Sequence, residues 1–281
     1  MKSPLVVILV GLLLGACGNQ EEAVVQSGSF TALTYNVAGL PEGISGSNPE
    51  TNMQMISPLL NAYDLVLVQE DFSYHHELVS QLDHPHQSPS MDPSESASIM
   101  TDGLNRFSRT PFEAFERQKW VACFGGISGN ASDCLADKGF SFAIHDLGEG
   151  VLVHVYNFHA EAGGAAEDNQ AREEGYDQLI EYMQTQSKNA AVVVGADTNL
   201  HGFDEADEPV LLKFMEETGL ADVCRTLDCG DEQIDRFFFR SSENLSIAPT
   251  QWQVATEFVT EDGSELSDHP AIHVSFDWQQ Q

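Results

Sequence analysis

The chain has 281 residues, of which 44 are acidic and 12 are basic, so its formal net charge at pH 7 is −32. A surface of this charge repels polyanions, which disfavours general affinity for nucleic acid. It does not exclude a nuclease, because bound divalent cations and a few local arginines can reverse the potential inside one groove. The simplest interpretation of the charge is solubility or adaptation to a salty habitat.

The N-terminus has the parts of a secretory signal. Lys2 precedes an apolar stretch at residues 5–14, and small residues follow up to Cys17. This order is typical of an exported protein. The apolar stretch is well short of the roughly 20 residues that cross a bilayer, so the sequence favours a cleaved signal over a retained transmembrane helix.

The end of this segment, Leu14-Gly15-Ala16-Cys17, resembles the lipobox of bacterial lipoproteins, in which the cysteine is acylated and becomes the first residue. The resemblance implies a signal peptide at residues 1–16 and membrane attachment through a lipid on Cys17. Because Gly18 replaces the aspartate that marks inner-membrane retention, it also implies an outer-membrane or cell-surface lipoprotein. The alternative is an ordinary signal peptide cleaved nearby. We expect residues 17–29 to form a flexible tether without catalytic residues.

About 265 residues remain after the signal, which suits one layered domain and is short for two. We therefore expect a single domain at residues 30–278, as a monomer with no protein partner inferred. Short β-like runs alternate with amphipathic helical stretches, which predicts an α/β or α+β layered domain. Strands are predicted at residues 30–37, 64–69, 105–108, 140–145, 151–159, 190–195, 234–239, 251–258 and 271–276. Helices are predicted at residues 51–61, 74–82, 167–186 and 208–218.

Two stretches rich in Pro, Ser and Gly, residues 41–49 and 83–98, follow predicted strands or motifs. Loops around an active site have this composition, although surface decoration explains it equally well.

Four cysteines follow Cys17, and an even number in an exported protein favours two disulfides. Three pairings are formally possible, and we expect Cys123–Cys134 and Cys224–Cys229. Four buried thiols are the alternative. CxxC spacings are absent, so a structural zinc site has no support.

Acidic, amide and imidazole side chains stand at the ends of the strongest predicted strands, where a sheet can hold them rigidly. In chain order they are Asn36 in TYNVAGLP, Glu70 in DLVLVQED, His159 in VYNFHAEAG, Asp197 and Asn199 in VVVGADTN, Asp235 in IDRFFFR, and Asp268 and His269 in SDHPAIHV. Each motif alone is weak evidence, but six of them in one order are hard to produce by chance.

This order (N, QE, H, GDxN, D followed by Y or R, and SDH) strongly resembles the endonuclease/exonuclease/phosphatase superfamily, from residue 30 to residue 276. The resemblance implies a four-layer α/β sandwich in which two mixed β-sheets pack face to face and helices flank them. It also implies metal-dependent hydrolysis of a phosphate ester. Ala196 departs from the family glycine before the aspartate, which alanine can replace unless the backbone needs a positive φ.

The chemistry explains these residue types. The carboxylate of Glu70 and the amide oxygen of Asn36 are hard ligands that suit Mg²⁺ or Mn²⁺, and a metal held there can neutralise charge on a phosphoryl group. By resemblance, Asp268 helps to bind the metal. The alternative for Glu70 is a buried, capped glutamate, and a second metal at His84 and His86 is a weaker hypothesis.

His269, oriented by Asp235, resembles the general base pair that activates a water in this family, and an imidazole with a pKa of roughly 6.5 suits that role. By resemblance, Asp197 and Asn199 orient the nucleophile and the phosphate. The aspartate that matches Asp197 has been assigned different roles among relatives, so its role here stays open. His159 is expected to donate a hydrogen bond to a phosphoryl oxygen; a satisfied strand-end histidine is the alternative. We expect Arg106 and Arg109 to support structure.

Within the superfamily, the segment CLADKGFSF at residues 134–142, followed by NFHAEAG and a helix bearing Arg172, resembles bacterial sphingomyelinase C and its relatives. Export, a lipid anchor and the lack of a basic face agree with a lipid headgroup as substrate, favoured over DNA. Against this, IDR at residues 234–236 resembles the deoxyribonuclease motif, and no aromatic hairpin for membrane insertion is recognised. The alternatives are a secreted endonuclease, a phosphatase for inositol-type phosphates and, least favoured, a non-catalytic surface lipoprotein.

Overall fold

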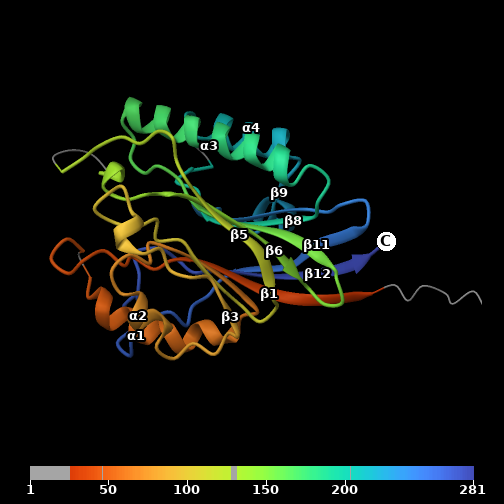
Figure 1. Ribbon diagram of the computed structural model, residues 1–281, viewed down its shortest axis with the longest axis horizontal. Helices are drawn as coiled ribbons and strands as arrows, with labels where there is room; N and C mark the ends of the chain where they lie inside the picture. The colour runs from red at the N-terminus through yellow and green to blue at the C-terminus, as the bar shows by residue number, and fades with distance from the viewer. Residues whose placement is uncertain (1–25, 46, 128–131, 203) are drawn as a thin grey trace, which may run out of the picture.

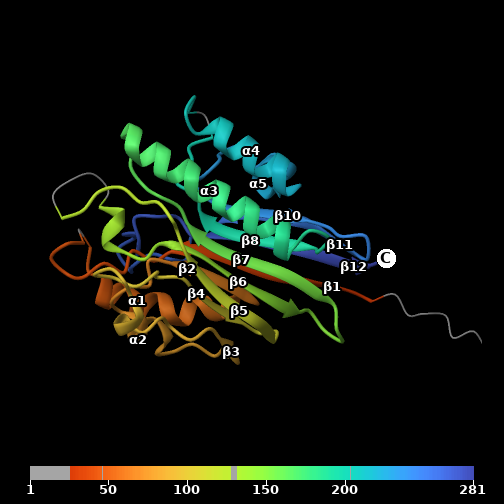
Figure 2. The same cartoon turned by 45° about the horizontal axis from the view of Figure 1, so that its top comes forward.

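The computed structural model describes residues 26–45, 47–127, 132–202 and 204–281 as two face-to-face β-sheets with helices on both outer sides (Figure 1). Figure 2 shows α3 and α4 over one sheet and α1 and α2 under the other. The four-layer α/β sandwich that the motifs imply is therefore confirmed. The predicted signal peptide and Cys17 lie outside the described residues.

The first sheet contains six strands in the order β11-β12-β1-β2-β4-β3. β1 and β2 are parallel, and the other neighbours are antiparallel. Its strands are β1 (Ser27–Asn36), β2 (Leu65–Gln69), β3 (His86–Gln87), β4 (Asn105–Ser108), β11 (Leu245–Val254) and β12 (Ile272–Gln280).

The second sheet has the order β5-β6-β7-β8-β10-β9, in which only β7 and β8 are parallel. Its strands are β5 (Phe112–Lys119), β6 (Gly139–Asp146), β7 (Leu152–His159), β8 (Val192–Asp197), β9 (Ala221–Asp222) and β10 (Asp235–Arg240). Each sheet thus has one parallel pair at its centre, and the two pairs face each other across the sandwich.

The longest helix, α3, covers the second sheet together with α4, and α1 and α2 cover the first sheet. The helices are α1 (Pro49–Leu59), α2 (His75–Val79), α3 (Ala166–Gln186), α4 (Glu208–Thr218) and α5 (Val223–Leu227), with 3-10 turns η1 (Leu60–Ala62), η2 (Pro93–Glu95) and η3 (Asp133–Leu135). Pro49 begins α1, where its missing N–H costs no hydrogen bond. Gly219 ends α4 at φ 68°, a left-handed conformation that glycine adopts without steric cost.

Aliphatic and aromatic side chains fill the space between the sheets, among them Ala32, Leu67, Val155 and Val193. A Cβ atom at Gly195 would lie 2.8 Å from Leu67 Cδ1, so the glycine lets the two central strand pairs approach closely. Two further apolar cores join the outer helices to the sheets. Burial of apolar surface on both faces explains why the central strands are apolar throughout.

Most predicted elements are found within a few residues of their expected positions, but two predictions need correction and one long strand was missed. β1 begins at Ser27 and pairs with Gln279, so residues 27–29 belong to the sheet and not to a tether. The strand predicted at residues 251–258 is instead β11, which ends at Val254. β5 was not predicted, because its charged residues suit an edge strand with one exposed face.

The predicted disulfides Cys123–Cys134 and Cys224–Cys229 are both present. Arg106 is fully buried and donates hydrogen bonds to the Val155 carbonyl and the Ser141 hydroxyl, which confirms its structural role. Arg109 pairs with Asp83 at the surface. Among the described residues, no helix is long and apolar enough to cross a membrane.

Candidate active site

Strand register brings the predicted residues to one edge of the sandwich. Asn36 ends β1 opposite Gln69 of β2, while Asp197 of β8 lies between His159 of β7 and Asp235 of β10. Because the carboxyl ends of parallel strands lie at the same edge, each central pair delivers its last residue to this place. Face-to-face packing of the sheets then unites the two sets.

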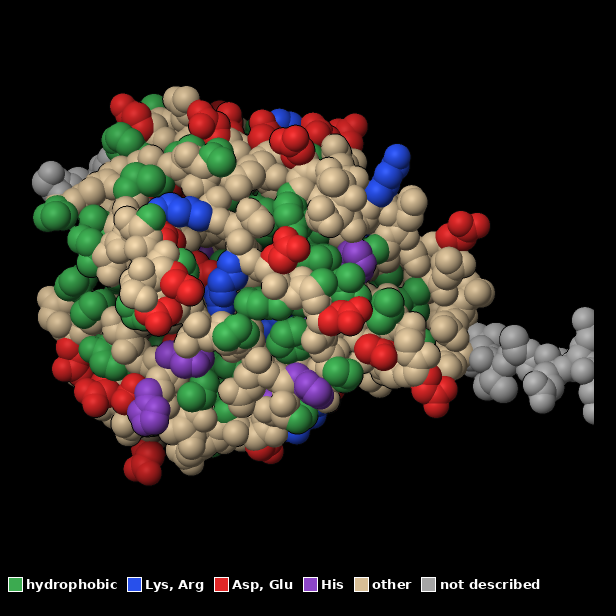
Figure 3. All heavy atoms as spheres, in the orientation of Figure 1, with side chains coloured by type: hydrophobic (Ala, Val, Ile, Leu, Met, Phe, Trp, Pro, Cys, Tyr) green, Lys and Arg blue, Asp and Glu red, His purple; other side chains and the backbone are tan. Residues whose placement is uncertain are grey.

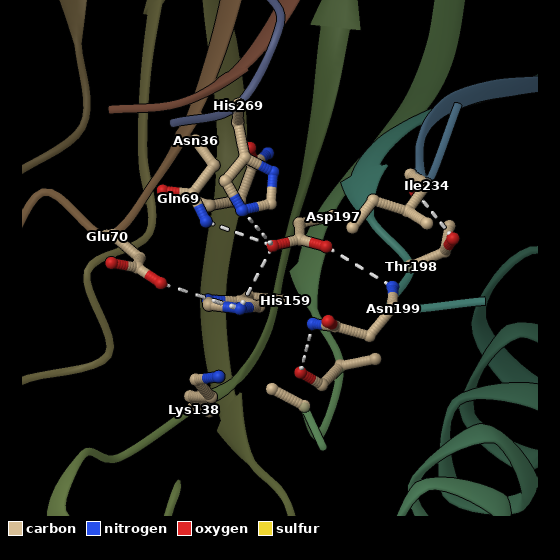
Figure 4. Close-up of polar contacts among 12 residues, drawn as sticks. Asn36, Gln69, Glu70, Lys138, His159, Asp197, Thr198, Asn199, Ile234 and His269 are labelled. Atoms are coloured by element: carbon tan, nitrogen blue, oxygen red, sulfur yellow. Dashed lines mark hydrogen bonds and ion pairs between the residues drawn. The ribbon is translucent and has the colours of Figure 1, made fainter. Parts of the chain in front are cut away.

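Asp197 is the centre of the cluster (Figure 4). Its Oδ2 accepts a hydrogen bond from Asn36 Nδ2 at 3.0 Å and lies 3.1 Å from His159 Nε2. Its Oδ1 accepts from the backbone N–H of Asn199 at 3.2 Å. Burial alone would raise the pKa of the Asp197 carboxyl, but the charge and hydrogen bond of His159 hold it well below its usual range. Asp197 is therefore a permanently charged acceptor that orients its neighbours.

His269 and Asp235 form the expected pair: His269 Nδ1 lies 2.8 Å from Asp235 Oδ2 and donates a hydrogen bond to it. Burial and the charge of Asp197 raise the pKa of Asp235 to about 6. Burial lowers the pKa of His269, but the hydrogen bond and charge of Asp235 and the charge of Asp197 outweigh it and raise that pKa to about 10. Nε2 of His269, 3.9 Å from Asp197 Oδ2, remains for substrate or water.

Ser267 positions the loop that carries His269, a role that the sequence analysis missed. Its hydroxyl donates to the Asn36 carbonyl at 2.7 Å and accepts from the His269 N–H at 3.2 Å. The serine of the SDH motif therefore ties the loop before β12 to the end of β1. Asp268, in contrast, is exposed, and its Oδ1 lies 3.5 Å from the Ser267 hydroxyl. Its expected role as a metal ligand stays a prediction.

Glu70 sits in a left-handed backbone conformation directly after β2, with φ 57°. Its carbonyl accepts hydrogen bonds from Gly39 N at 3.0 Å and Phe72 N at 2.8 Å. A Cβ atom at Gly39 would lie 2.4 Å from that carbonyl oxygen, so only glycine permits this contact. Sparsely populated backbone conformations of this kind persist where surrounding contacts enforce them, often at functional sites. The Glu70 carboxylate, 18% exposed, points toward His159, with 3.9 Å between Oε1 and Nε2.

The oxygen atoms of Glu70 and Asn36 fit a divalent cation. The Glu70 carboxylate is partly exposed, and Asn36 Oδ1 accepts one bond from Ala38 N at 3.0 Å and keeps a second lone pair. Hard oxygen donors of this kind suit Mg²⁺ or Mn²⁺.

Among the described residues, Asp197, Asp235 and His269 also form a potential metal-binding group, with ligand atoms within 4.8 Å of one another. The 2.8 Å contact between His269 and Asp235 explains much of that clustering, so we favour the Glu70 side. His84 and His86 belong to no such group in the described chain. His84 is a buried histidine whose Nε2 contacts the Tyr63 carbonyl.

Lys138 is a second residue whose place in the site was missed. It is buried, forms an ion pair with Asp133, and lies beside His159 in Figure 4. Burial lowers the pKa of Lys138, but the charges of Asp133 and Glu70 outweigh it and raise that pKa. The only signal in the sequence was the CLADKGFSF segment, in which Lys138 directly precedes β6.

The structure thus gathers Asn36, His159, Asp197, Asn199, Asp235 and His269, with Glu70 facing His159. Asn199 adopts φ 48° and donates from Nδ2 to the Ala160 carbonyl at 3.1 Å. Ala196 is not among the residues with positive φ, so alanine fits where the family has glycine.

No protein-family model matches the chain. Curated proteins named sphingomyelinase, from Mycobacterium tuberculosis and Mycobacterium bovis, are 32% identical to it over 271 residues. The match covers 89% of this chain and 53% of the relatives, so the chain spans about half of their length.

Solved structures share the fold. Beta toxin from Staphylococcus aureus matches with a TM-score of 0.66 and 18% identity, covering 87% of this chain and 99% of the toxin; a variant of the toxin contains bound magnesium ions. Sphingomyelinase C from Streptomyces griseocarneus matches with a TM-score of 0.65 and 18% identity, covering 88% of this chain and 99% of that one. TDP2 from D. rerio, in complex with a single-stranded DNA product, matches with a TM-score of 0.65 and 16% identity, covering 88% and 98%.

The solved structures confirm the deoxyribonuclease-I-like fold that the resemblance to the endonuclease/exonuclease/phosphatase superfamily implies. In sequence, the chain is similar to proteins named sphingomyelinase over about half of their length.

Proposed function

We propose that the protein is a metal-dependent phosphodiester hydrolase that acts on a phospholipid headgroup of the sphingomyelin type. The observation that carries this proposal is the arrangement at the sheet edge, where the Asp235–His269 pair faces Glu70 across Asp197 and Asn36. The homology to sphingomyelinases supports the choice of substrate.

The residues divide the work of hydrolysis. Asp235 accepts the Nδ1 proton of His269, which fixes the ring so that Nε2 can take a proton from an attacking water. The carboxylate of Asp197 holds Asn36 and His159 in place. His159 and Lys138 supply positive charge or hydrogen bonds to phosphoryl oxygens, because both line the Glu70 side of the site.

Glu70 and Asn36 would hold the cation, with Mg²⁺ preferred. A divalent cation held there would neutralise charge on the phosphoryl oxygens and would lower the pKa of neighbouring groups such as His269. The second effect matters, because a His269 with a raised pKa is protonated at neutral pH and cannot accept a proton.

A nuclease is the second candidate, since TDP2 shares the fold and the IDR motif resembles that of deoxyribonucleases. Arg236 of that motif is 2% exposed and forms ion pairs with Asp222 and Glu232. The Arg236 guanidinium therefore makes contacts inside the protein and is not accessible to a nucleic acid backbone. Together with the net charge of −32, this favours the lipid substrate.

We also propose that the protein is exported and attached to the outer membrane or the cell surface by a lipid on Cys17. The lipobox-like segment supports this proposal. Mass spectrometry of the membrane-associated protein should show an acylated Cys17 as the first residue. A mature protein that begins at another residue and carries no acyl group would contradict the proposal.

The test of the activity compares sphingomyelin vesicles with plasmid DNA, each with Mg²⁺ and with chelator. We expect phosphocholine release that needs the metal and no nicking of DNA. Nicking without phosphocholine release would identify a nuclease. Inactivity on both substrates would refute both the sphingomyelin and the DNA hypotheses. His269→Ala, prepared in parallel, controls for contaminating hydrolases.

A further inference from the structure

Four loop residues expose far more aliphatic surface than the rest of the described chain. Ile44 is 73% exposed, Ile99 71%, Val121 77% and Ile127 86%. The other exposed large hydrophobic side chains, among them Leu152 and Leu212, are between 37% and 48% exposed. We refer to Ile44, Ile99, Val121 and Ile127 as the aliphatic rim.

The loops of the aliphatic rim lie at the end of the sandwich that carries the site. The loop with Ile44 follows β1, and Gly39 at its start contacts Glu70. Figures 1 and 2 both show the loop after β1 and the loop after β5 at the same end of the molecule, beyond the ends of β1 and β7.

Hydrogen bonds connect the remaining rim segments to each other and to the site. Lys119 Nζ donates to the Ser98 hydroxyl at 2.9 Å, which joins the segments of Val121 and Ile99. Phe124 N donates at 2.7 Å to Glu161, two residues beyond His159. The rim segments therefore have fixed partners and border the strand ends that bear the site residues.

Three of the rim residues, Ile99, Val121 and Ile127, lie in segments without charged side chains. Residues 120–127 and residues 96–101 contain no Asp, Glu, Lys or Arg, although 20% of the whole chain is charged. In Figure 3, hydrophobic side chains gather along the upper left margin, at the end where these loops lie, with acidic side chains below them and along the top edge over α3 and α4. Three of the four rim residues therefore lie in uncharged segments of a strongly acidic protein, whereas Ile44 follows the exposed Glu42.

We propose that the aliphatic rim docks onto a zwitterionic phospholipid surface and so places a headgroup at the site. The inference rests on the proposed function, and deepens it by assigning the surface that meets the membrane. Exposed aliphatic side chains gain free energy when they enter the apolar boundary of a bilayer. An anionic membrane is the poorer partner, because the net charge of −32 is repelled by it. This docking relies on aliphatic side chains and does not require an aromatic side chain.

The test measures vesicle binding separately from catalysis. All proteins begin at Gly18, so that neither the apolar signal segment at residues 5–14 nor an acyl group on Cys17 supplies the binding. The rim variant is Ile99→Ser with Val121→Ser; the matched control is Leu152→Ser with Leu212→Ser, which removes two exposed leucines from the start of β7 and from α4. Each is sedimented with phosphatidylcholine–sphingomyelin vesicles, with and without phosphatidylserine, in chelator.

We expect the rim variant to bind neutral vesicles at least about tenfold more weakly than the parent, and the control to match the parent. Phosphatidylserine should weaken binding of the parent. Turnover of a soluble phosphocholine ester should be equal in all three proteins, since the rim does not touch the reacting atoms.

Failure of the parent to bind neutral vesicles, or equal losses in the rim and control variants, would overturn the proposal. A parent that is dimeric in solution and becomes monomeric in the rim variant would also overturn it, because the rim would then be an interface between two copies. A chain that binds vesicles through the rim but hydrolyses no phosphodiester would refute the proposed function alone.

Discussion

Two buried clusters of charge lie on opposite sides of β10 and differ in how their charges are matched. On one side Asp235 joins Asp197, His159 and His269. On the other side Arg236, the next residue, pairs with Asp222 and Glu232. Because successive side chains of a strand point to opposite faces, one dipeptide contributes to both clusters.

In the Arg236 cluster every carboxylate is paired with an arginine. Arg225 adds pairs to Glu208 and Glu232, so both guanidinium groups meet carboxylates. Burial raises the pKa of Glu232, but Arg225 and Arg236 outweigh it and lower that pKa. In the site, carboxylates repel one another and the pKa of Asp235 rises to about 6. The comparison supports a structural role for the Arg236 cluster and is consistent with the proposed cation and phosphate site beside Asp235.

Glu70→Ala should produce the largest change. Without that carboxylate the site loses the proposed main metal ligand, so metal-dependent turnover should fall below detection while the melting temperature changes little. Stopped assays of phosphocholine release and Mn²⁺ titration calorimetry measure the two effects. If the variant keeps the parent's metal-dependent turnover, the assignment to Glu70 is wrong and the metal is better placed at the Asp197, Asp235 and His269 group.

His269→Ala should lower turnover by roughly a thousandfold, because general base catalysis contributes about 10²–10⁴-fold. Mn²⁺ binding should be retained, since Glu70 and Asn36 remain. If the variant loses the metal together with the activity, His269 is a ligand and its assigned role is wrong. The melting temperature of the variant, measured beside that of the parent, controls for general loss of folding.

The fold was readable from the sequence where apolar strands end in polar residues, as at Asn36, Glu70 and Asp197. Ser267 and Lys138 were missed because their roles depend on contacts with β1 and Asp133, which are distant along the chain or carry no local pattern. β5 was missed for a different reason. As an edge strand with a bulge between Glu113 and Glu116, it keeps charged residues and loses strict alternation.

Arg236→Met should destabilise the protein by about 3–5 kcal/mol, because it leaves buried carboxylates of Asp222 and Glu232 without their partner. Activity per folded molecule should change much less than in His269→Ala. Urea unfolding followed by fluorescence gives the free energy of unfolding. A loss below about 1 kcal/mol would contradict the structural role of this cluster.

The smallest effect concerns pH and separates the two clusters directly. In chelator, the pKa of His269 is raised from about 6.5 to about 10 in the folded protein, so folding favours the protonated ring. The resulting stabilisation is complete below pH 6.5 and is lost as pH rises toward 10. The difference in unfolding free energy between the parent and His269→Asn should therefore shrink over this window. The difference between the parent and Arg236→Met should stay flat, because arginine keeps its charge and the lowered pKa of Glu232 lies below the window. If the difference in unfolding free energy changes with pH in the same way for both variants, the two clusters do not differ in the way proposed.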